Sequence, residues 1–233
     1  MVENNGKLSI IATPIGNLED MTFRAVRILK EADIIAAEDT RKAKILLNKF
    51  EIGPKKMFSH HVQNEHKSMG GIVAAVLAGN KIAVISEAGC PCVSDPGFLV
   101  IREALKNGLE PEFIPGVSAL TFTAMASGLP SDKFTFYGFL PPKKGARHKL
   151  LGEIAESGVT SIIFESPMRI QRLVQEIVEF VGADCGLSLI REATKMHEEV
   201  IRGGANDVMN KIKDRNLKGE FVVAVSARYK PEY

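Results

Sequence analysis

Residues 84–97, VISEAGCPCVSDPG, decide how this chain is organised. An apolar, β-type run at 82–85 opens into glycines, prolines and short polar side chains. A plain strand-to-helix corner needs only roughly two to six residues, and this connection is longer. Loops beyond the carboxyl end of a strand are where α/β proteins carry their ligand sites. The stretch therefore predicts a ligand-binding loop rather than a simple turn.

Short β-type runs alternate with helical patterns on both sides of this loop. Thr22 is a predicted helix cap, and Ala43, Leu46, Leu47 and Phe50 lie on one helical face. The predicted strands are 8–12, 34–37, 82–85, 112–114, 134–137, 160–164, 187–190 and 221–225, and further helices are predicted at 69–77, 99–106, 147–156, 168–180 and 207–213. Pro115-Gly116 interrupts the pattern near its middle. We predict an α/β protein of two lobes, 1–114 and 115–233, with a cleft between them.

Composition excludes several classes of protein. The chain has 233 residues, 45% of them hydrophobic, and a net charge of +2, so any nucleic-acid contact must come from a local basic patch. Three cysteines at irregular spacing indicate a reducing compartment and no metal site. The start, MVENNGKLSI, lacks a signal-peptide pattern, and no apolar run reaches the ~20 residues of a membrane helix. We expect a cytoplasmic protein.

Four predicted strand ends carry small or polar residues. They are TPIGN (13–17), the loop within residues 84–97, PGVSA (115–119) and ESPMR (165–169). We call the loop within 84–97 the opening loop. Small residues let main-chain groups approach a ligand closely. None matches a GxGxxG fingerprint or a P-loop, which disfavours a dinucleotide or a nucleoside triphosphate. Together they favour a nucleoside-like ligand.

Charged clusters supply further candidates, each with a plainer alternative. Asp39 and Arg41 in AEDTR either cap a helix or orient a substrate hydroxyl. The basic run 143–149 is either solvated surface or a contact with a phosphate backbone. The histidines of SHHVQNEH (59–66) favour a solvated or RNA-facing loop over a metal site. REATKMHEE (191–199) gathers charges after an apolar strand, a placement that a random charged surface does not explain.

The order of these motifs, with GFLPPK and KGEF, resembles one family over nearly the whole chain. The sequence is similar to the rRNA small-subunit methyltransferase I family, within the tetrapyrrole-methylase fold group. The resemblance implies two α/β lobes, a homodimer, and S-adenosylmethionine in the cleft. It implies methyl transfer to the ribose 2′-hydroxyl of a cytidine in small-subunit rRNA, and a ribosomal subunit as partner. The chain departs from the family pattern at Glu87, Cys90, Cys92, Val117 and Met168.

The resemblance also implies roles for individual residues. Cofactor contacts, largely through main chain, are expected from Pro14, Ala88, Gly89, Cys90, Val93, Ser118, Ala119, Phe164, Glu165, Ala193, Thr194, Gly219 and Glu220. The catalytic candidates are Asp39, Arg41, Lys195 and Glu198, with Asp39 or Glu198 as base or orienter and the two cations steering phosphate. Expected RNA contacts are Lys143, Lys144, Arg147, Lys149 and Arg169. The alternatives are a tetrapyrrole methyltransferase and a non-catalytic RNA-binding relative.

Overall fold

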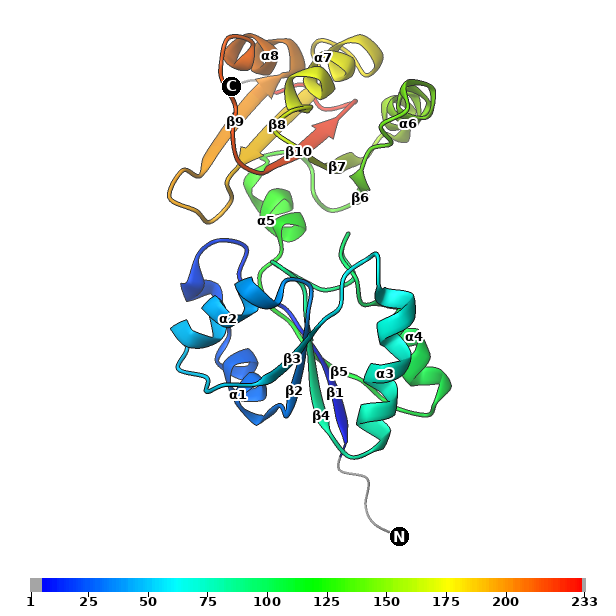
Figure 1. Cartoon of the computed structure of the whole chain (residues 1–233). Helices are drawn as coiled ribbons and strands as arrows, with labels where there is room; N and C mark the ends of the chain where they lie inside the picture. The colour runs from blue at the N-terminus through cyan, green and yellow to red at the C-terminus, as the bar shows by residue number, and fades with distance from the viewer. Residues whose placement is uncertain (1–5, 232–233) are drawn as a thin grey trace. The chain divides into compact units, whose positions relative to one another are not determined.

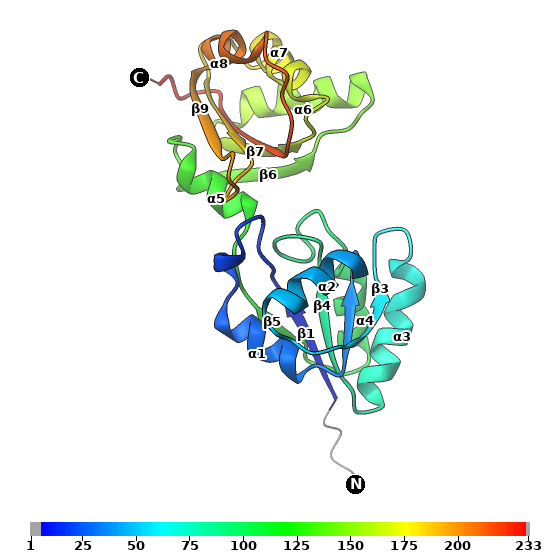
Figure 2. The same cartoon turned by 60° about the vertical axis from the view of Figure 1, so that its left-hand side comes forward.

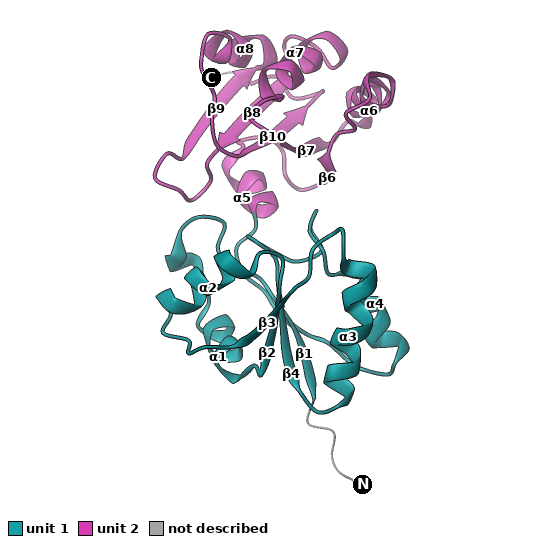
Figure 3. Cartoon of the chain, viewed as in Figure 1, with its two compact units in different colours: residues 1–118 teal, residues 119–233 magenta. Residues whose placement is uncertain are grey.

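The computed structural model describes residues 6–231 and divides the chain into two compact units, Met1–Ser118 and Ala119–Tyr233 (Figure 3). The first five residues of the stretch considered for a signal peptide lie outside the described residues. The division falls after Ser118 rather than after residue 114. The Cys90 thiol donates to the Val117 carbonyl at 3.7 Å, so the PGVSA loop packs with the first unit.

The first unit is built on one parallel sheet in the order β3-β2-β4-β1-β5. Its elements are β1 (Lys7–Ile11), the 3-10 turn η1 (Leu18–Asp20), α1 (Phe23–Glu31), β2 (Ile34–Ala37), α2 (Thr40–Lys49), β3 (Lys56–Ser59), α3 (Glu65–Leu77), β4 (Lys81–Ile85), α4 (Phe98–Lys106) and β5 (Glu112–Ile114). Helices α1 and α2 cover one face and α3 and α4 the other (Figures 1 and 2). Both faces are thus buried, which explains why β2 and β4 are almost uniformly apolar.

The second unit is built on a mixed sheet in the order β6-β7-β10-β8-β9. Its elements are α5 (Ala119–Ala126), β6 (Phe134–Phe139), α6 (Lys144–Ser157), β7 (Thr160–Glu165), α7 (Ile170–Phe180), β8 (Gly186–Arg191), β9 (Glu199–Gly204), α8 (Ala205–Ile212) and β10 (Phe221–Ser226). Helices α6, α7 and α8 pack on one face around Leu151, Leu173 and Val208, and α5 packs on the other (Figure 1).

The predicted α/β class with two lobes is confirmed. Thr22 caps α1 as expected, because its hydroxyl accepts the Ala25 N–H at 3.1 Å. The sequence analysis missed β3, β9 and α5. Strand β3 is only four residues long and begins with the exposed Lys56, so its apolar period is too short to recognise. The helix predicted from 168 starts at Ile170, since Arg169 N donates to the Ser166 carbonyl in a turn.

Among the described residues, no helix is both long enough and apolar enough to cross a membrane.

Candidate active site

Three loops of the first unit meet at the carboxyl edge of its sheet. They follow β4, β1 and β5, which are neighbours in the sheet. Thr13 N donates to the Gly89 carbonyl at 2.8 Å, and Gly89 N donates back to Thr13 at 3.0 Å. The Cys90–Val117 hydrogen bond joins the third loop. The structure thereby gathers the first-unit residues expected to hold the cofactor, namely Pro14, Ala88, Gly89, Cys90, Val93 and Ser118.

Two glycines in these loops lie very close to neighbouring atoms. Gly89 has φ +76°, and a Cβ there would lie 3.2 Å from the Ile15 side chain. A Cβ on Gly116 would come within 2.9 Å of Ala12 Cβ. Beside them, Thr13 Oγ1 is buried and has no hydrogen-bond partner in the described part of the chain. Close main chain with an unsatisfied buried hydroxyl fits a small polar ligand such as S-adenosylmethionine, which these loops would hold through N–H and C=O groups.

The two cysteines of the opening loop are not reactive thiolates. Burial raises the pKa of Cys90, and burial together with Glu65 and Asp95 raises the pKa of Cys92 to about 11. Both thiols are therefore protonated at neutral pH. In the part of the chain that the structure describes, no three His, Cys, Asp or Glu side chains group closely enough to hold a metal ion.

Asp39 caps helix α2, as one of its two predicted roles required. Its Oδ1 accepts the Arg41 N–H at 2.8 Å, and its Oδ2 pairs with the Arg41 guanidinium at 2.8 Å. Hydrogen bonds from the Arg41 side chain and backbone lower the pKa of Asp39 to about 2. A carboxylate this acidic is a poor proton acceptor at neutral pH. Asp39 thus orients Arg41, and its role as general base stays a prediction that this low pKa disfavours.

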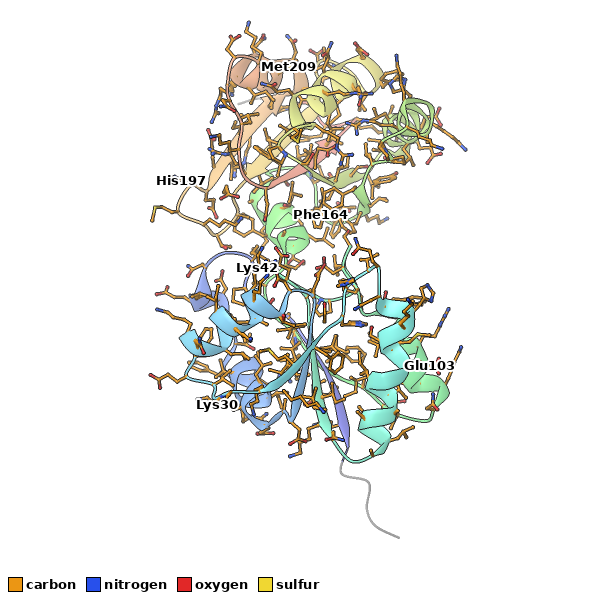
Figure 4. All side chains as sticks on the ribbon, in the orientation of Figure 1. Lys30, Lys42, Glu103, Phe164, His197 and Met209 are labelled. Atoms are coloured by element: carbon orange, nitrogen blue, oxygen red, sulfur yellow. The ribbon has the colours of Figure 1, made fainter. Side chains whose placement is uncertain are left out.

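Further acidic residues lie beside Asp39, and none of them was among the predicted site residues. Glu87 N donates to Glu38 Oε2 at 3.1 Å, and the Lys42 ammonium, labelled on α2 in Figure 4, pairs with the Glu87 carboxylate. Asp95, from the SDPG end of the opening loop, faces this cluster. Burial, and then the charges of Glu38 and Glu87, raise the pKa of Asp95 to about 7. The acidic residues in the SEAG and SDPG motifs were the available sequence signal.

Glu65 fixes the far end of the same loop. It is buried in the first turn of α3, and its Oε1 accepts the N–H groups of Gly97 at 2.8 Å and Leu99 at 3.0 Å. These N–H groups lie at the start of α4, where Gly97 has no side chain to cap them. Glu65 therefore caps a neighbouring helix.

Nearby His60 is fully buried and hydrogen bonded to Ser68 Oγ at 2.8 Å, so the expectation of a solvated histidine loop is wrong for His60.

In the second unit, the candidate residues gather at one edge of the mixed sheet. Strand β10 runs antiparallel to both β7 and β8, and Phe221 pairs with Glu165 on one side and Arg191 on the other. The carboxyl ends of β7 and β8 therefore meet the start of β10. This places together the pairs Phe164–Glu165, Ala193–Thr194 and Gly219–Glu220, with Phe164 labelled in Figure 4. Ala119 instead starts α5, on the sheet face that this helix covers.

The loop from β8 to β9 is tied together by Glu192. Its Oε1 accepts the Lys195 ammonium at 2.9 Å and the Glu220 N–H at 2.9 Å. A Cβ on Gly219, which has φ +99°, would lie 2.6 Å from this carboxylate, so only glycine fits. Partial burial lowers the pKa of Lys195, but the carboxylates of Glu192 and Glu220 outweigh it and raise the pKa overall. Lys195 is a permanent cation, suited to holding an anion.

Glu198 belongs to the same loop, where His197 is labelled in Figure 4. Its side chain is exposed, and its Oε2 accepts the Thr194 N–H at 2.6 Å. Thr194 has φ +66° and Glu192 has φ +51°, so this loop holds two residues in the left-handed region. Such a conformation persists only where surrounding contacts impose it, which is typical of functional loops.

Arg147 corrects the expected RNA contacts. It is 1% exposed, and it pairs with Glu165 at 3.2 Å and with Glu176. In α6 its spacing from Leu151 and Ile154 directs all three toward the core, so Arg147 cannot reach a phosphate. Lys143, Lys144 and Lys149 are exposed on the same helix segment, and Arg169 is partly exposed.

The side chain of Glu165 is likewise committed within the protein. It is buried, and its Oε1 accepts Ser166 N at 2.8 Å and Arg169 Nε at 2.8 Å, while Oε2 pairs with Arg147. Only its main chain is left for a cofactor. Met168, one of the departures from the family pattern, is 94% exposed and takes no part in this network.

Comparison with known proteins identifies the family. The family model "Tetrapyrrole (Corrin/Porphyrin) Methylases" matches residues 7–208. A ribosomal RNA small subunit methyltransferase I of Thermotoga maritima is 40% identical over 96% of this chain and 99% of its own length. One from Halalkalibacterium halodurans is 41% identical over 96% of this chain and 76% of its own length. The chain belongs to this methyltransferase family.

Solved structures support the fold. The methyltransferase CobJ has a TM-score of 0.70 at 17% identity, covering 95% of this chain and 94% of CobJ. The cobalt precorrin-4 methyltransferase CbiF has a TM-score of 0.67 at 17% identity, covering 94% of each chain. The protein is thus a methyltransferase with the tetrapyrrole-methylase fold, and S-adenosylmethionine is its cofactor.

Proposed function

We propose that this methyltransferase modifies small-subunit ribosomal RNA at the 2′-hydroxyl of a cytidine ribose. Similarity to relatives named ribosomal RNA small subunit methyltransferase I, over nearly the full length of the chain, carries this proposal. A second support is the cationic edge of the second unit, where Lys143, Lys144, Lys149 and Arg169 follow the ends of β6 and β7. Exposed cations of this kind bind phosphates without reading sequence.

The reaction is an in-line displacement. S-adenosylmethionine supplies a methyl group activated by its positive sulfur. That methyl carbon would be transferred to the ribose oxygen as its bond to sulfur breaks, and a carboxylate of this chain would take the hydroxyl proton. Positioning of the two reactants contributes much of the rate. The close-packed loop around Gly89 in the first unit supports a rigid cofactor site lined by main chain.

We assign to Glu198 the role of accepting the proton of the ribose hydroxyl. Arg41 and Lys195 are assigned the steering of phosphate. Glu198 is an exposed carboxylate on a loop in a constrained conformation, and Asp39 is too acidic for the task. Lys195 stays charged beside Glu192, and Arg41 is held by Asp39 with 89% of its side chain exposed.

The test is methyl transfer from labelled S-adenosylmethionine to small subunits that lack the modification, followed by mapping of the modified ribose. We expect label at one cytidine ribose, and a fall in kcat on the order of 10²–10⁴-fold for Glu198→Gln. The matched control, Glu153→Gln, changes an exposed carboxylate on α6 and should leave kcat unchanged. Label on a tetrapyrrole but not on subunits, or unmodified subunits despite bound cofactor, would contradict the proposal.

We further propose a cytoplasmic homodimer. Large apolar side chains stay exposed on α4 and β5, namely Phe98, Leu105 and Phe113, and such surfaces favour association. Sedimentation equilibrium of the purified chain distinguishes a dimer from a monomer.

A further inference from the structure

Two carboxylates are buried between β7, α6 and α7, each holding more than one cation. Glu165 pairs with Arg147 at 3.2 Å and with Arg169 at 2.7 Å. Glu176 pairs with Arg147 and with Arg172 at 2.9 Å. Arg147 and Glu165 are almost fully buried, and Glu176 is 7% exposed. We call Arg147, Glu165 and Glu176 the ionic hub.

The hub together with its outer partners, Arg169 and Arg172, carries more positive than negative charge. Arg147, Arg169 and Arg172 face two carboxylates, and His148 Nε2 lies 3.7 Å from Glu176 Oε1 while its ring stacks on Phe180. Arg147 Nη2 is buried without a partner in the described part of the chain. The excess charge is on the outside, because Arg172 is 53% and Arg169 33% exposed.

Stability alone does not account for the hub. The surrounding core is apolar, with Leu151, Leu173 and Ile177 fully buried. Replacing a buried ion pair with well-packed apolar side chains is often neutral or stabilising, whereas removing one partner is strongly destabilising. What the hub does supply is fixed geometry: it joins the end of β7 to both helices that begin at this edge of the sheet.

Those two helices present the cations at that edge. Arg169 precedes α7 and Arg172 is three residues further on, so both lie on the same side of its first turn. Lys143 precedes α6, Lys144 is its first residue and Lys149 lies five residues further along. All three are exposed and without an ion pair among the described residues. Neither first turn contains an acidic side chain. We call Lys143, Lys144, Lys149, Arg169 and Arg172 the cationic face.

We propose that the ionic hub is a positioning device that holds the cationic face in register for the phosphates of RNA, with Arg172 as a contact alongside Arg169. The inference rests on the proposed function, whose substrate it describes further. A side-chain ammonium or guanidinium that is pre-set by a buried partner loses less conformational freedom on binding, and so binds phosphate more tightly. Hydrogen bonds from Arg147 and Arg172 outweigh burial and keep the pKa of Glu176 below its usual range, so Glu176 stays ionised at neutral pH.

The test replaces the buried pair without changing net charge. In Arg147→Met with Glu176→Leu, every cation of the face is kept and the core stays filled, so the chain should fold and bind S-adenosylmethionine as the wild type does, by calorimetry. We expect a 5- to 20-fold rise in KM for small subunits with kcat within about twofold. A purely structural hub predicts an unchanged KM in this folded variant, and that result would overturn the proposal.

A second variant separates geometry from charge. Glu176→Gln makes this region more positive, so bulk attraction predicts tighter RNA binding, whereas loss of positioning predicts weaker binding.

Arg172→Ala should lower the slope of log K against log salt by about 0.7–0.9, the value for one phosphate contact. Lys133→Ala, an exposed cation at the opposite end of β6, is the matched control and should leave the slope unchanged.

The two proposals fail in distinguishable ways. If the proposed function fails, the wild-type chain binds subunits without methylating them. If the hub has no positioning role, the double variant binds and methylates as the wild type does, and Glu176→Gln binds RNA more tightly.

Discussion

At the scale of single residues, neighbouring charges decide which carboxyl groups can take a proton. Asp39 and Asp95 both belong to strand-end loops of the first unit, and both are aspartates in short polar motifs. The Arg41 guanidinium lowers the pKa of Asp39 to about 2, while burial and the charges of Glu38 and Glu87 raise the pKa of Asp95 to about 7. The same residue type is therefore always ionised at one position and half-protonated near neutral pH at the other.

Asp95 gives stability a measurable pH dependence. Its folded pKa lies above its unfolded value, so the folded state binds more protons between about pH 4 and pH 7, and stability falls as pH rises through this window. Asp95→Asn removes this penalty. We expect the variant to gain stability relative to the wild type as pH rises from 4 to 7, by on the order of 1 kcal/mol after solvent screening.

Urea denaturation at a series of pH values measures the difference. The control, Asp132→Asn, changes an exposed aspartate of the second unit and should show no such trend. A difference between Asp95→Asn and wild type that stays flat from pH 4 to pH 7 would show that Asp95 titrates normally.

At the scale of elements, helix α4 depends on a side chain from another helix. Gly97 precedes α4 with φ +139°, and a Cβ there would lie 2.7 Å from Cys92 Sγ, so a capping side chain has no room. The Glu65 carboxylate replaces it by accepting two N–H groups of the first turn. This contact also fixes the end of the opening loop.

Removal of that cap should loosen α4 and the loop before it. We expect Glu65→Ala to lower stability by about 1–2 kcal/mol, the usual effect of losing a cap. Hydrogen exchange should accelerate at the Gly97 and Leu99 amides. Glu65→Gln keeps an acceptor oxygen and should be much milder. Equal exchange rates in Glu65→Ala and the wild type would show that the cap is not needed.

At the scale of the whole molecule, the chain consists of two units, each with its own sheet and apolar core. The buried clusters on both faces of the first sheet belong wholly to the first unit, and those of the second sheet to the second unit. Each unit of this size is long enough to fold alone.

We therefore expect residues 1–118 and 119–233, expressed separately, to fold. Each should show a cooperative thermal transition by circular dichroism, with near-ultraviolet bands from ordered aromatic side chains. The full chain is the reference. Loss of the near-ultraviolet signal with retained helix content would indicate a molten state, and would mean that each unit needs the other.

The sequence by itself determined the alternation of strands and helices, the loops at strand ends and the family. The hydrophobic period and the order of the motifs can both be read along the chain before it folds. The spacing of Arg147, Leu151 and Ile154 on one helix face also predicts that Arg147 points into the core. Counting the basic residues of the segment does not use this signal. Only the tertiary structure decided which carboxylates meet which cations. The contacts of Glu65 with Gly97 and of Arg147 with Glu176 join residues about thirty positions apart. Burial and partner charge, which set the pKa of Asp95 and the availability of Arg147, exist only once the chain has folded. The sequence predicts a ligand site at the opening loop, but it did not predict the loop's anchor, Glu65, or its titrating carboxyl, Asp95.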